Sequence, residues 1–216
     1  TASFAEASAR LGWSAEPALD VDAAVIVPPD IGELDLERAR TLTQVYAYVQ
    51  PKLLLLTAGW AAGLALPAGP ALRAHGAAVP PPDGWASDVD LPPPVAADAP
   101  SAGGLLEEMA RRRQQPGLAD YYRRLATWPS LLAVCWGFLE PLTASAEYVE
   151  RSVRLAAAAT SAATSLGLTE AGAVGPVGDR ELVELVTGWR HVQVPPLMLD
   201  TRILGRALAA ARAPER

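Results

Sequence analysis

The residues best suited to chemistry lie together at positions 120–122, where Asp120 precedes Tyr121 and Tyr122. A carboxylate within reach of a water molecule can act as a general base. Asp120 could equally be a helix N-cap, accepting backbone N–H groups. The two tyrosines, together with Tyr48, could line a pocket and donate hydrogen bonds to an anion, or could pack as ordinary half-buried rings. The residues alone leave both interpretations open for each side chain.

A second carboxylate, Asp200, lies in the apolar stretch 197–201. A carboxylate in such surroundings needs a cationic partner, and Arg190 and Arg202 are the nearest candidates in sequence. We therefore favour a structural ion pair over catalysis at this position. His191 has the chemistry of a base, but no acidic residue close to it in sequence could orient its ring.

Cofactor and metal chemistry have little support in the sequence. The chain has two histidines and one cysteine, which form no metal-ligand cluster, and no glycine-rich phosphate loop is present. We predict no metal and no cofactor. Cys135 lies in an apolar run and is expected to be a buried, inert thiol, which fits a reducing cytoplasm. His75 precedes a proline-rich segment and is expected to be exposed.

The composition predicts an all-α fold. Half of the residues are apolar, and alanine and leucine, both good helix formers, dominate. The net charge is −6, and the short cluster Arg111–Arg113 is expected to be a solvated helix end, so nucleic-acid binding is not predicted. The apolar run from Leu53 to Leu66 is too short to span a membrane. The first residues show no signal-peptide pattern, and we expect a cytoplasmic protein.

Caps and prolines divide the sequence into expected helices, because proline opens helices readily but breaks them internally. Ser145 is the clearest predicted N-cap. The expected helices span approximately 2–16, 35–49, 51–64, 101–115, 119–127, 129–138, 146–166, 179–192 and 195–212.

An internal duplication is predicted from matches at a constant offset of 144 positions. Residues 4–11 match 148–155 at glutamate, serine, arginine and leucine, and residues 37–64 match 181–208 at seven positions. We expect two tandem helical repeats that form a pseudo-dimer. Residues 1–78 would be a partial first repeat without its opening helices, 79–100 a proline-rich linker, and 101–216 the complete second repeat.

Two segments resemble one protein family. One is 117–129, GLADYYRRLATWP, which is continued by Trp136 and by Glu140-Pro141-Leu142; the other is 46–55, YAYVQPKLLL. Both are similar to the DehI-type 2-haloacid dehalogenases, which act on D- and L-haloacids. The resemblance implies an all-helical fold of two repeats around a central site.

The resemblance also implies a mechanism. An aspartate in this family activates a water molecule that displaces halide from C2, and an asparagine before a Pro-Lys pair helps to hold the water or the substrate. In this sequence Gln50 stands at the asparagine position. Tyr121 stands at the aspartate position, with Asp120 one residue earlier. The implied catalytic residues are Asp120 and Gln50, and the implied substrate-binding residues are Tyr48, Tyr121, Tyr122 and Trp128.

The sequence therefore predicts a dehalogenase-like hydrolase that acts on a small 2-haloacid. The alternative is a repurposed or catalytically inactive protein on the same scaffold that binds a small, carboxylate-bearing ligand. A shortened first repeat would leave an apolar face uncovered, and we expect a homodimer for that reason.

Overall fold

Every regular element in the described part of the chain is a helix, as the composition predicts. The structure is a computed structural model, and it describes residues 3–15, 25–64, 90–96, 99–100, 102–115, 117–168 and 180–211. Predicted features at His75, at Asp179, in most of the linker 79–100 and in most of the loop 167–178 lie outside these ranges.

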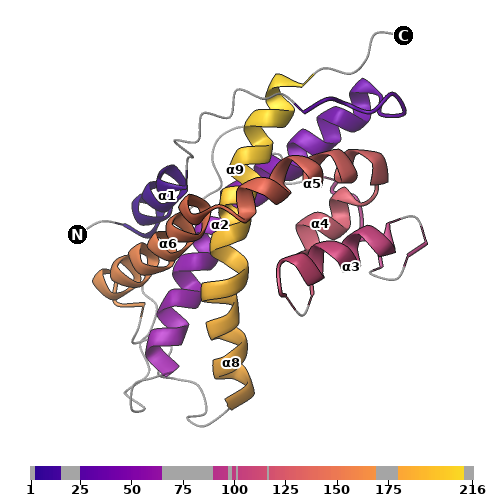
Figure 1. The fold of residues 1–216 in the computed structure, drawn as a ribbon. Coiled ribbons are helices and arrows are strands. Elements are labelled where there is room, and N and C mark those ends of the chain that lie inside the picture. The colour runs from indigo at the N-terminus through magenta and orange to yellow at the C-terminus, as the bar shows by residue number, and fades with distance from the viewer. Residues whose placement is uncertain are drawn as a thin grey trace.

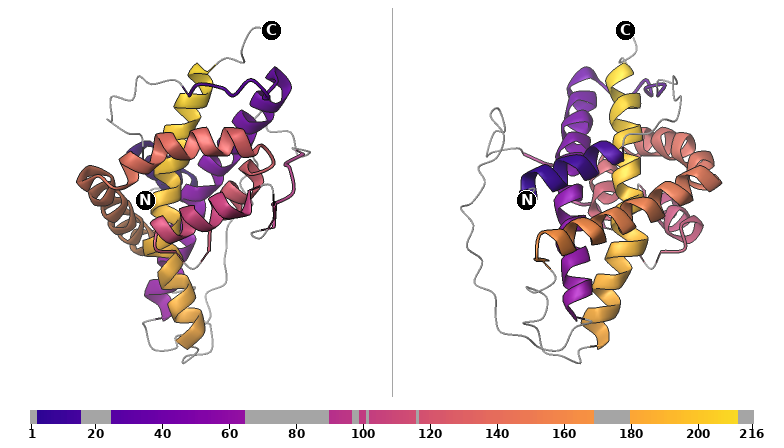
Figure 2. Two further views of the ribbon diagram at one scale, coloured as in Figure 1. Left: turned by 45° about the vertical axis from the view of Figure 1, so that its right-hand side comes forward. Right: turned by 90° about the vertical axis from the view of Figure 1, so that its left-hand side faces the viewer.

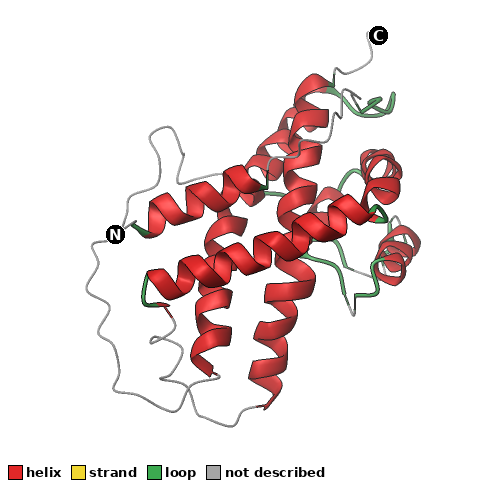
Figure 3. Ribbon diagram, turned by 60° about the vertical axis from the view of Figure 1, so that its left-hand side comes forward, coloured by secondary structure: helices red, strands yellow, loops and turns green. Residues whose placement is uncertain are grey.

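Two long helical rods form the centre of the fold. Helix α2 (Glu33–Leu64) runs in one direction, and α8 (Arg180–Gly188), η1 (Trp189–Gln193) and α9 (Val194–Ala210) run in the other as one continuous rod. Figures 1 and 2 show the two rods packed side by side. Helices α1 (Phe4–Ser14) and α6 (Ala146–Ser165) lie across this pair, as Figure 3 shows.

Three further helices lie together on one side of the rods: α3 (Gly103–Arg112), α4 (Asp120–Leu125) and α5 (Pro129–Thr143). Helix α4 contacts α2, and α5 contacts α9. The buried apolar side chains of α1, α2, α3, α4, α5, α6 and α9 form one continuous core. The short α4 therefore packs against α2, on the same side of the rods as α3 and α5.

Two serine caps fix where the crossing helices begin. The hydroxyl of Ser145 accepts a hydrogen bond of 3.2 Å from the backbone N–H of Tyr148, which confirms the predicted cap of α6. At the start of α1, Ser3 and Glu6 form a reciprocal capping box.

The prolines interrupt the helices less than the sequence predicts. We expected separate helices on either side of Pro51, but α2 continues through it, and α5 continues through Pro141. Before Pro195 and Pro196, we expected a helix end. Instead the rod widens into the π-helical segment η1. Packing against neighbouring helices outweighs the hydrogen bond that each internal proline removes.

Thr57 in α2 and Thr201 in α9 make equivalent contacts at the predicted offset. The Thr57 hydroxyl donates to the carbonyls of Leu53 and Leu54, and the Thr201 hydroxyl donates to those of Leu197 and Met198. Such contacts are common for threonine in helices, and the duplication stays a prediction. The pseudo-dimer arrangement itself stays a prediction.

Cys135 in α5 is buried, as expected, and burial raises its pKa to about 12. Among the described helices, none combines the length and apolarity required to cross a bilayer.

One close helix contact generates a stability prediction. Gly59 in α2 is buried, and a Cβ atom added there would lie 2.7 Å from Cβ and 3.1 Å from the carbonyl oxygen of Leu168. Gly59→Ala should therefore lower the free energy of unfolding by about 1–3 kcal/mol, measured by urea denaturation.

Gly137 in α5 is the matched control, because an added Cβ meets nothing within 4 Å. Gly137→Ala should raise stability by about 0.5–1 kcal/mol through helix propensity alone. Equal effects of the two substitutions would contradict the proposed contact.

Candidate functional site

The Asp200 carboxylate is the most deeply buried charged group in the described structure, with no exposed surface. It lies on α9, within a turn of the apolar residues Leu197 and Leu199. Removing a carboxylate from water is costly unless hydrogen bonds and an opposite charge replace the solvent. The environment of Asp200 must therefore supply both.

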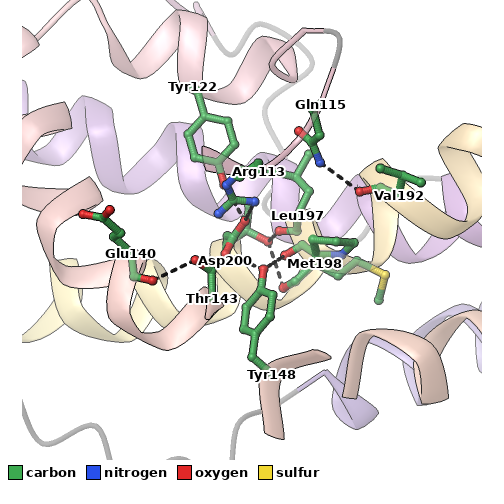
Figure 4. Close-up of polar contacts among 12 residues, drawn as sticks. Arg113, Gln115, Tyr122, Glu140, Thr143, Tyr148, Val192, Leu197, Met198 and Asp200 are labelled. Atoms are coloured by element: carbon green, nitrogen blue, oxygen red, sulfur yellow. Dashed lines mark hydrogen bonds and ion pairs between the residues drawn. The ribbon is translucent and has the colours of Figure 1, made fainter. Parts of the chain in front are cut away.

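Three side chains from three other segments converge on Asp200, as Figure 4 shows. The Nη1 atom of Arg113, at the end of α3, lies 2.8 Å from Oδ2. The Tyr122 hydroxyl, from α4, also donates to Oδ2. The Tyr148 hydroxyl, from α6, lies 2.8 Å from Oδ1 and 2.9 Å from the carbonyl oxygen of Pro196. Both carboxylate oxygens thus have partners, and the group is a structural ion pair.

The ion pair predicted for Asp200 is confirmed, but the predicted partners are wrong. Arg113 takes the place expected for Arg190 or Arg202, and Arg190 instead donates to the Thr160 hydroxyl at 2.5 Å. Proximity in sequence favoured the wrong arginines, because the end of α3 reaches α9 only through the tertiary fold.

Arg113 is also an exception to the predicted solvated helix end. Its side chain is 7% exposed, whereas that of Arg111 is 72% exposed. The guanidinium lies between aromatic rings, 5.1 Å from the Tyr122 centroid and 5.4 Å from that of Trp136. A signal was present in the sequence, because Arg113 continues the apolar stripe of Leu106 and Met109 at helical spacing.

The electrostatics keep Tyr122, Tyr148 and Arg113 each in one protonation state at neutral pH. Burial raises the pKa values of Tyr122 and Tyr148 well above 10.0, so both remain hydrogen-bond donors. Burial disfavours the charged Arg113 guanidinium, but the adjacent Asp200 outweighs this and raises its pKa above the usual value.

A second group of polar side chains lies on the face of α2 that meets α4. The Tyr121 hydroxyl lies 3.1 Å from the Thr43 hydroxyl, and its ring centroid is 5.3 Å from that of Tyr46. Gln50 follows Tyr46 by one helical turn and is 4% exposed, and its Oε1 has no hydrogen-bond partner among the described residues. A buried, unpaired amide oxygen of this kind can accept a hydrogen bond from a bound molecule.

Asp120 lies at the rim of this second group. It is the first residue of α4, its side chain is 52% exposed, and it pairs with Arg123 at 3.2 Å. The N-cap is Ala119, without a side-chain hydrogen bond, so the capping alternative for Asp120 is wrong. Burial raises the pKa of Tyr46, while Arg124 lowers it and Asp120 raises it further, so both charges act on the Tyr46 hydroxyl.

The remaining predicted binding residues are more dispersed. Tyr48 is half-buried, with the Lys52 ammonium 3.3 Å from its ring centroid. Trp128 is buried at the N-cap position of α5, and Tyr122 contacts Asp200. The structure therefore brings Gln50, Tyr121 and the rim residue Asp120 to one region of α2 and α4.

No group of three or more potential metal ligands occurs in the described ranges. His191 lies in η1, and partial burial and the nearby Arg190 lower its pKa.

The arrangement of helices matches solved structures of D-2-haloacid dehalogenases. One, described as a complex with L-LA, has a TM-score of 0.71 and 19% identity, and the match covers 95% of this chain and 76% of that chain. The chain has a dehalogenase fold. A mutant of such an enzyme matches with a TM-score of 0.69, 18% identity, and the same coverage.

A mutant complex with D-2-CPA matches this dehalogenase fold with a TM-score of 0.60, 16% identity, and coverage of 95% of this chain and 73% of that chain. No protein-family model and no curated protein matches the sequence. The narrower DehI-type assignment stays a prediction.

The Asp200 cluster predicts an asymmetry between two substitutions in the dehalogenase fold. Asp200→Asn leaves the buried Arg113 charge without its partner and should cost about 3–5 kcal/mol of stability. Tyr148→Phe removes the hydroxyl that contacts Asp200 and the Pro196 carbonyl, but it leaves the ion pair in place, and it should cost about 1.5–3 kcal/mol. Urea denaturation measures both.

A solvent-exposed acid serves as the control for these substitutions. Glu150 pairs with Arg154 at 3.3 Å, and both side chains are more than 60% exposed. Glu150→Gln should change stability by less than about 1 kcal/mol. If Asp200→Asn changed stability no more than Glu150→Gln, the structural role of the buried pair would be refuted.

The buried tyrosines predict a loss of stability at alkaline pH. Tyr121, Tyr122 and Tyr148 have raised pKa values because they are buried. Above about pH 10 the unfolded chain releases these protons while the folded chain retains them, so stability falls by up to about 1.4 kcal/mol per pH unit for each group. Denaturation from about pH 9 to about pH 11 measures the slope, and Tyr121→Phe should reduce it. A flat profile would contradict the burial of these hydroxyls.

Proposed function

We propose that the chain is a hydrolase of the dehalogenase type that acts on a small 2-halogenated carboxylic acid. The observation that carries this proposal is the buried, unpaired Oε1 of Gln50, on the face of α2 that Tyr121 of α4 contacts, within a dehalogenase fold. An unpaired acceptor at such a position suits a bound water molecule that must be held in a fixed orientation.

Asp120 is the proposed general base. Its charge acts on the Tyr46 hydroxyl, and its 52% exposure leaves it open to water. Asp120 removes a proton from the water, the water oxygen forms a bond to C2, and the carbon–halogen bond breaks with the electron pair leaving on the halide. The product is a 2-hydroxy acid. Arg124, next to Tyr46, supplies positive charge for the substrate carboxylate.

Tyr121 has a different role in this proposal, because it is neutral at physiological pH. Burial raises its pKa, so it cannot accept a proton from water, although its hydroxyl can donate a hydrogen bond. Its place in the family aspartate position favours the alternative function, a protein that binds a small carboxylate without turning it over. The ion pair of Asp120 with Arg123 favours the same alternative.

Halide release from each enantiomer of 2-chloropropionate tests the proposal. Wild-type protein should release chloride, and Asp120→Asn should lower the rate by about 100-fold or more, because the proposed base is lost. Asp35→Asn is the matched control: Asp35 lies in the first turn of α2 and pairs with Arg38 three residues later, as Asp120 pairs with Arg123. This control should keep the wild-type rate.

Gln50 variants and a binding measurement separate the two functions. Gln50→Leu should abolish chloride release, whereas Gln50→Asn, which retains an amide, should preserve part of it. Binding of 2-chloropropionate without chloride release would support the carboxylate-binding alternative. If the protein neither bound 2-chloropropionate nor released chloride from it, both functions would be refuted. The homodimer stays a prediction in either case.

A further inference from the structure

A second region of interest is a cavity of about 540 Å³ beside the Asp200 cluster, whose lining includes Arg113 and Tyr148 but no residue of α2. Its walls come from the end of α3, from α5 and α6, and from η1 with the start of α9. Neither Gln50 nor Asp120 belongs to its lining. The volume is in the range typical of sites for small organic molecules.

One wall of the cavity is apolar and open to solvent. Val149 and Val153 of α6 are 53% and 63% exposed, and Val192 of η1 is 44% exposed. Trp136 of α5 adds an aromatic surface. Exposed apolar side chains that gather around one concavity commonly mark a binding site.

A hydrogen bond between two segments of the lining holds the cavity in shape. Pro196 has no N–H group, so it cannot donate to the carbonyl of Val192 one turn earlier. The Gln115 side-chain amide donates to this carbonyl instead, at 2.9 Å, and Figure 4 shows the contact. The end of α3 is thereby tied to η1.

Arg113 is one of the residues that line the cavity, and its guanidinium has unused hydrogen-bonding capacity. Its Nη1 atom pairs with Asp200, but Nε and Nη2 are buried and have no hydrogen-bond partner among the described residues. The two N–H groups on this edge of a guanidinium point in the same direction. Their spacing matches the two oxygens of one carboxylate.

The charges around the cavity favour a ligand with one negative charge. Asp200 balances Arg113, and Glu140 lies 3.3 Å from Arg112 at the rim. A phosphate dianion would meet these two carboxylates with no excess of positive charge to offset them. A carboxylate satisfies both free N–H groups and brings one charge.

We propose that this cavity binds an organic monocarboxylate with an apolar chain. The carboxylate pairs side-on with Nε and Nη2 of Arg113, and the chain lies against Val149, Val153 and Val192. The site is distinct from the region of Gln50 and Asp120, and the proposal does not depend on dehalogenase activity.

Calorimetric titration with octanoate and with octanamide tests the proposal. Octanoate should bind, and octanamide, which lacks the charge and the second carboxylate oxygen, should bind at least about 10-fold more weakly. Arg113→Lys keeps the positive charge beside Asp200 but removes the side-on pair of N–H groups. It should lower octanoate affinity by at least about 10-fold while circular dichroism shows an unchanged helical content.

A second pair of variants leaves the buried ion pair intact. Val149→Glu places a negative charge in the cavity and should abolish octanoate binding. Val183→Glu changes another partly exposed valine, on α8 and outside the cavity, and should bind octanoate as the wild type does. Asp120→Asn should also keep octanoate affinity, because it alters the other site.

Three results would overturn the proposal. These are no octanoate binding to the wild-type protein, equal affinity for octanoate and octanamide, or equal octanoate binding by Val149→Glu and Val183→Glu.

Discussion

The ion pair of Asp200 with Arg113 is the constraint on which the arrangement of helices depends. A buried carboxylate requires partners, and here they come from the end of α3, from α4 and from α6. Each partner fixes its own segment against α9. The ion pair adds specificity more than stability, because an apolar core of the same volume would be at least as favourable. It excludes arrangements in which Asp200 or Arg113 would be buried alone.

The short helix α4 connects the two regions that have functional potential. Tyr121 and Tyr122 are adjacent in sequence, and their ring centroids are 5.2 Å apart. Their hydroxyls nevertheless contact different rods. The Tyr121 hydroxyl contacts the Thr43 hydroxyl on α2, whereas the Tyr122 hydroxyl donates to the Asp200 carboxylate on α9. Consecutive helical residues point in directions about 100° apart, which allows one turn of helix to serve both regions. If α4 began one residue earlier or later, the contacts of both tyrosines would be disturbed.

Local signals in the sequence predicted most of the helices, but tertiary contacts decided where they end. The Ser145 cap was predictable because it acts within one turn, and the all-helical class followed from composition. The continuity of α2 through Pro51 was not predictable, because packing against neighbouring helices outweighs the local tendency of proline to break a helix. Gln50 and Tyr121 were predicted as candidate site residues only through the family resemblance. The partner of Asp200 could not be predicted, because Arg113 is distant in sequence and only the fold brings them together.

The single cysteine gives this fold an internal reporter. Cys135 is 1% exposed in α5, and its thiol has a pKa of about 12. A thiol reagent must reach the sulfur and reacts with the thiolate. In the folded core the sulfur is inaccessible and the thiol stays protonated. Alkylation therefore reports only molecules in which α5 has separated from its neighbours, so its rate follows the opening of the core. The chain carries this probe in its natural sequence, and no labelling site need be introduced.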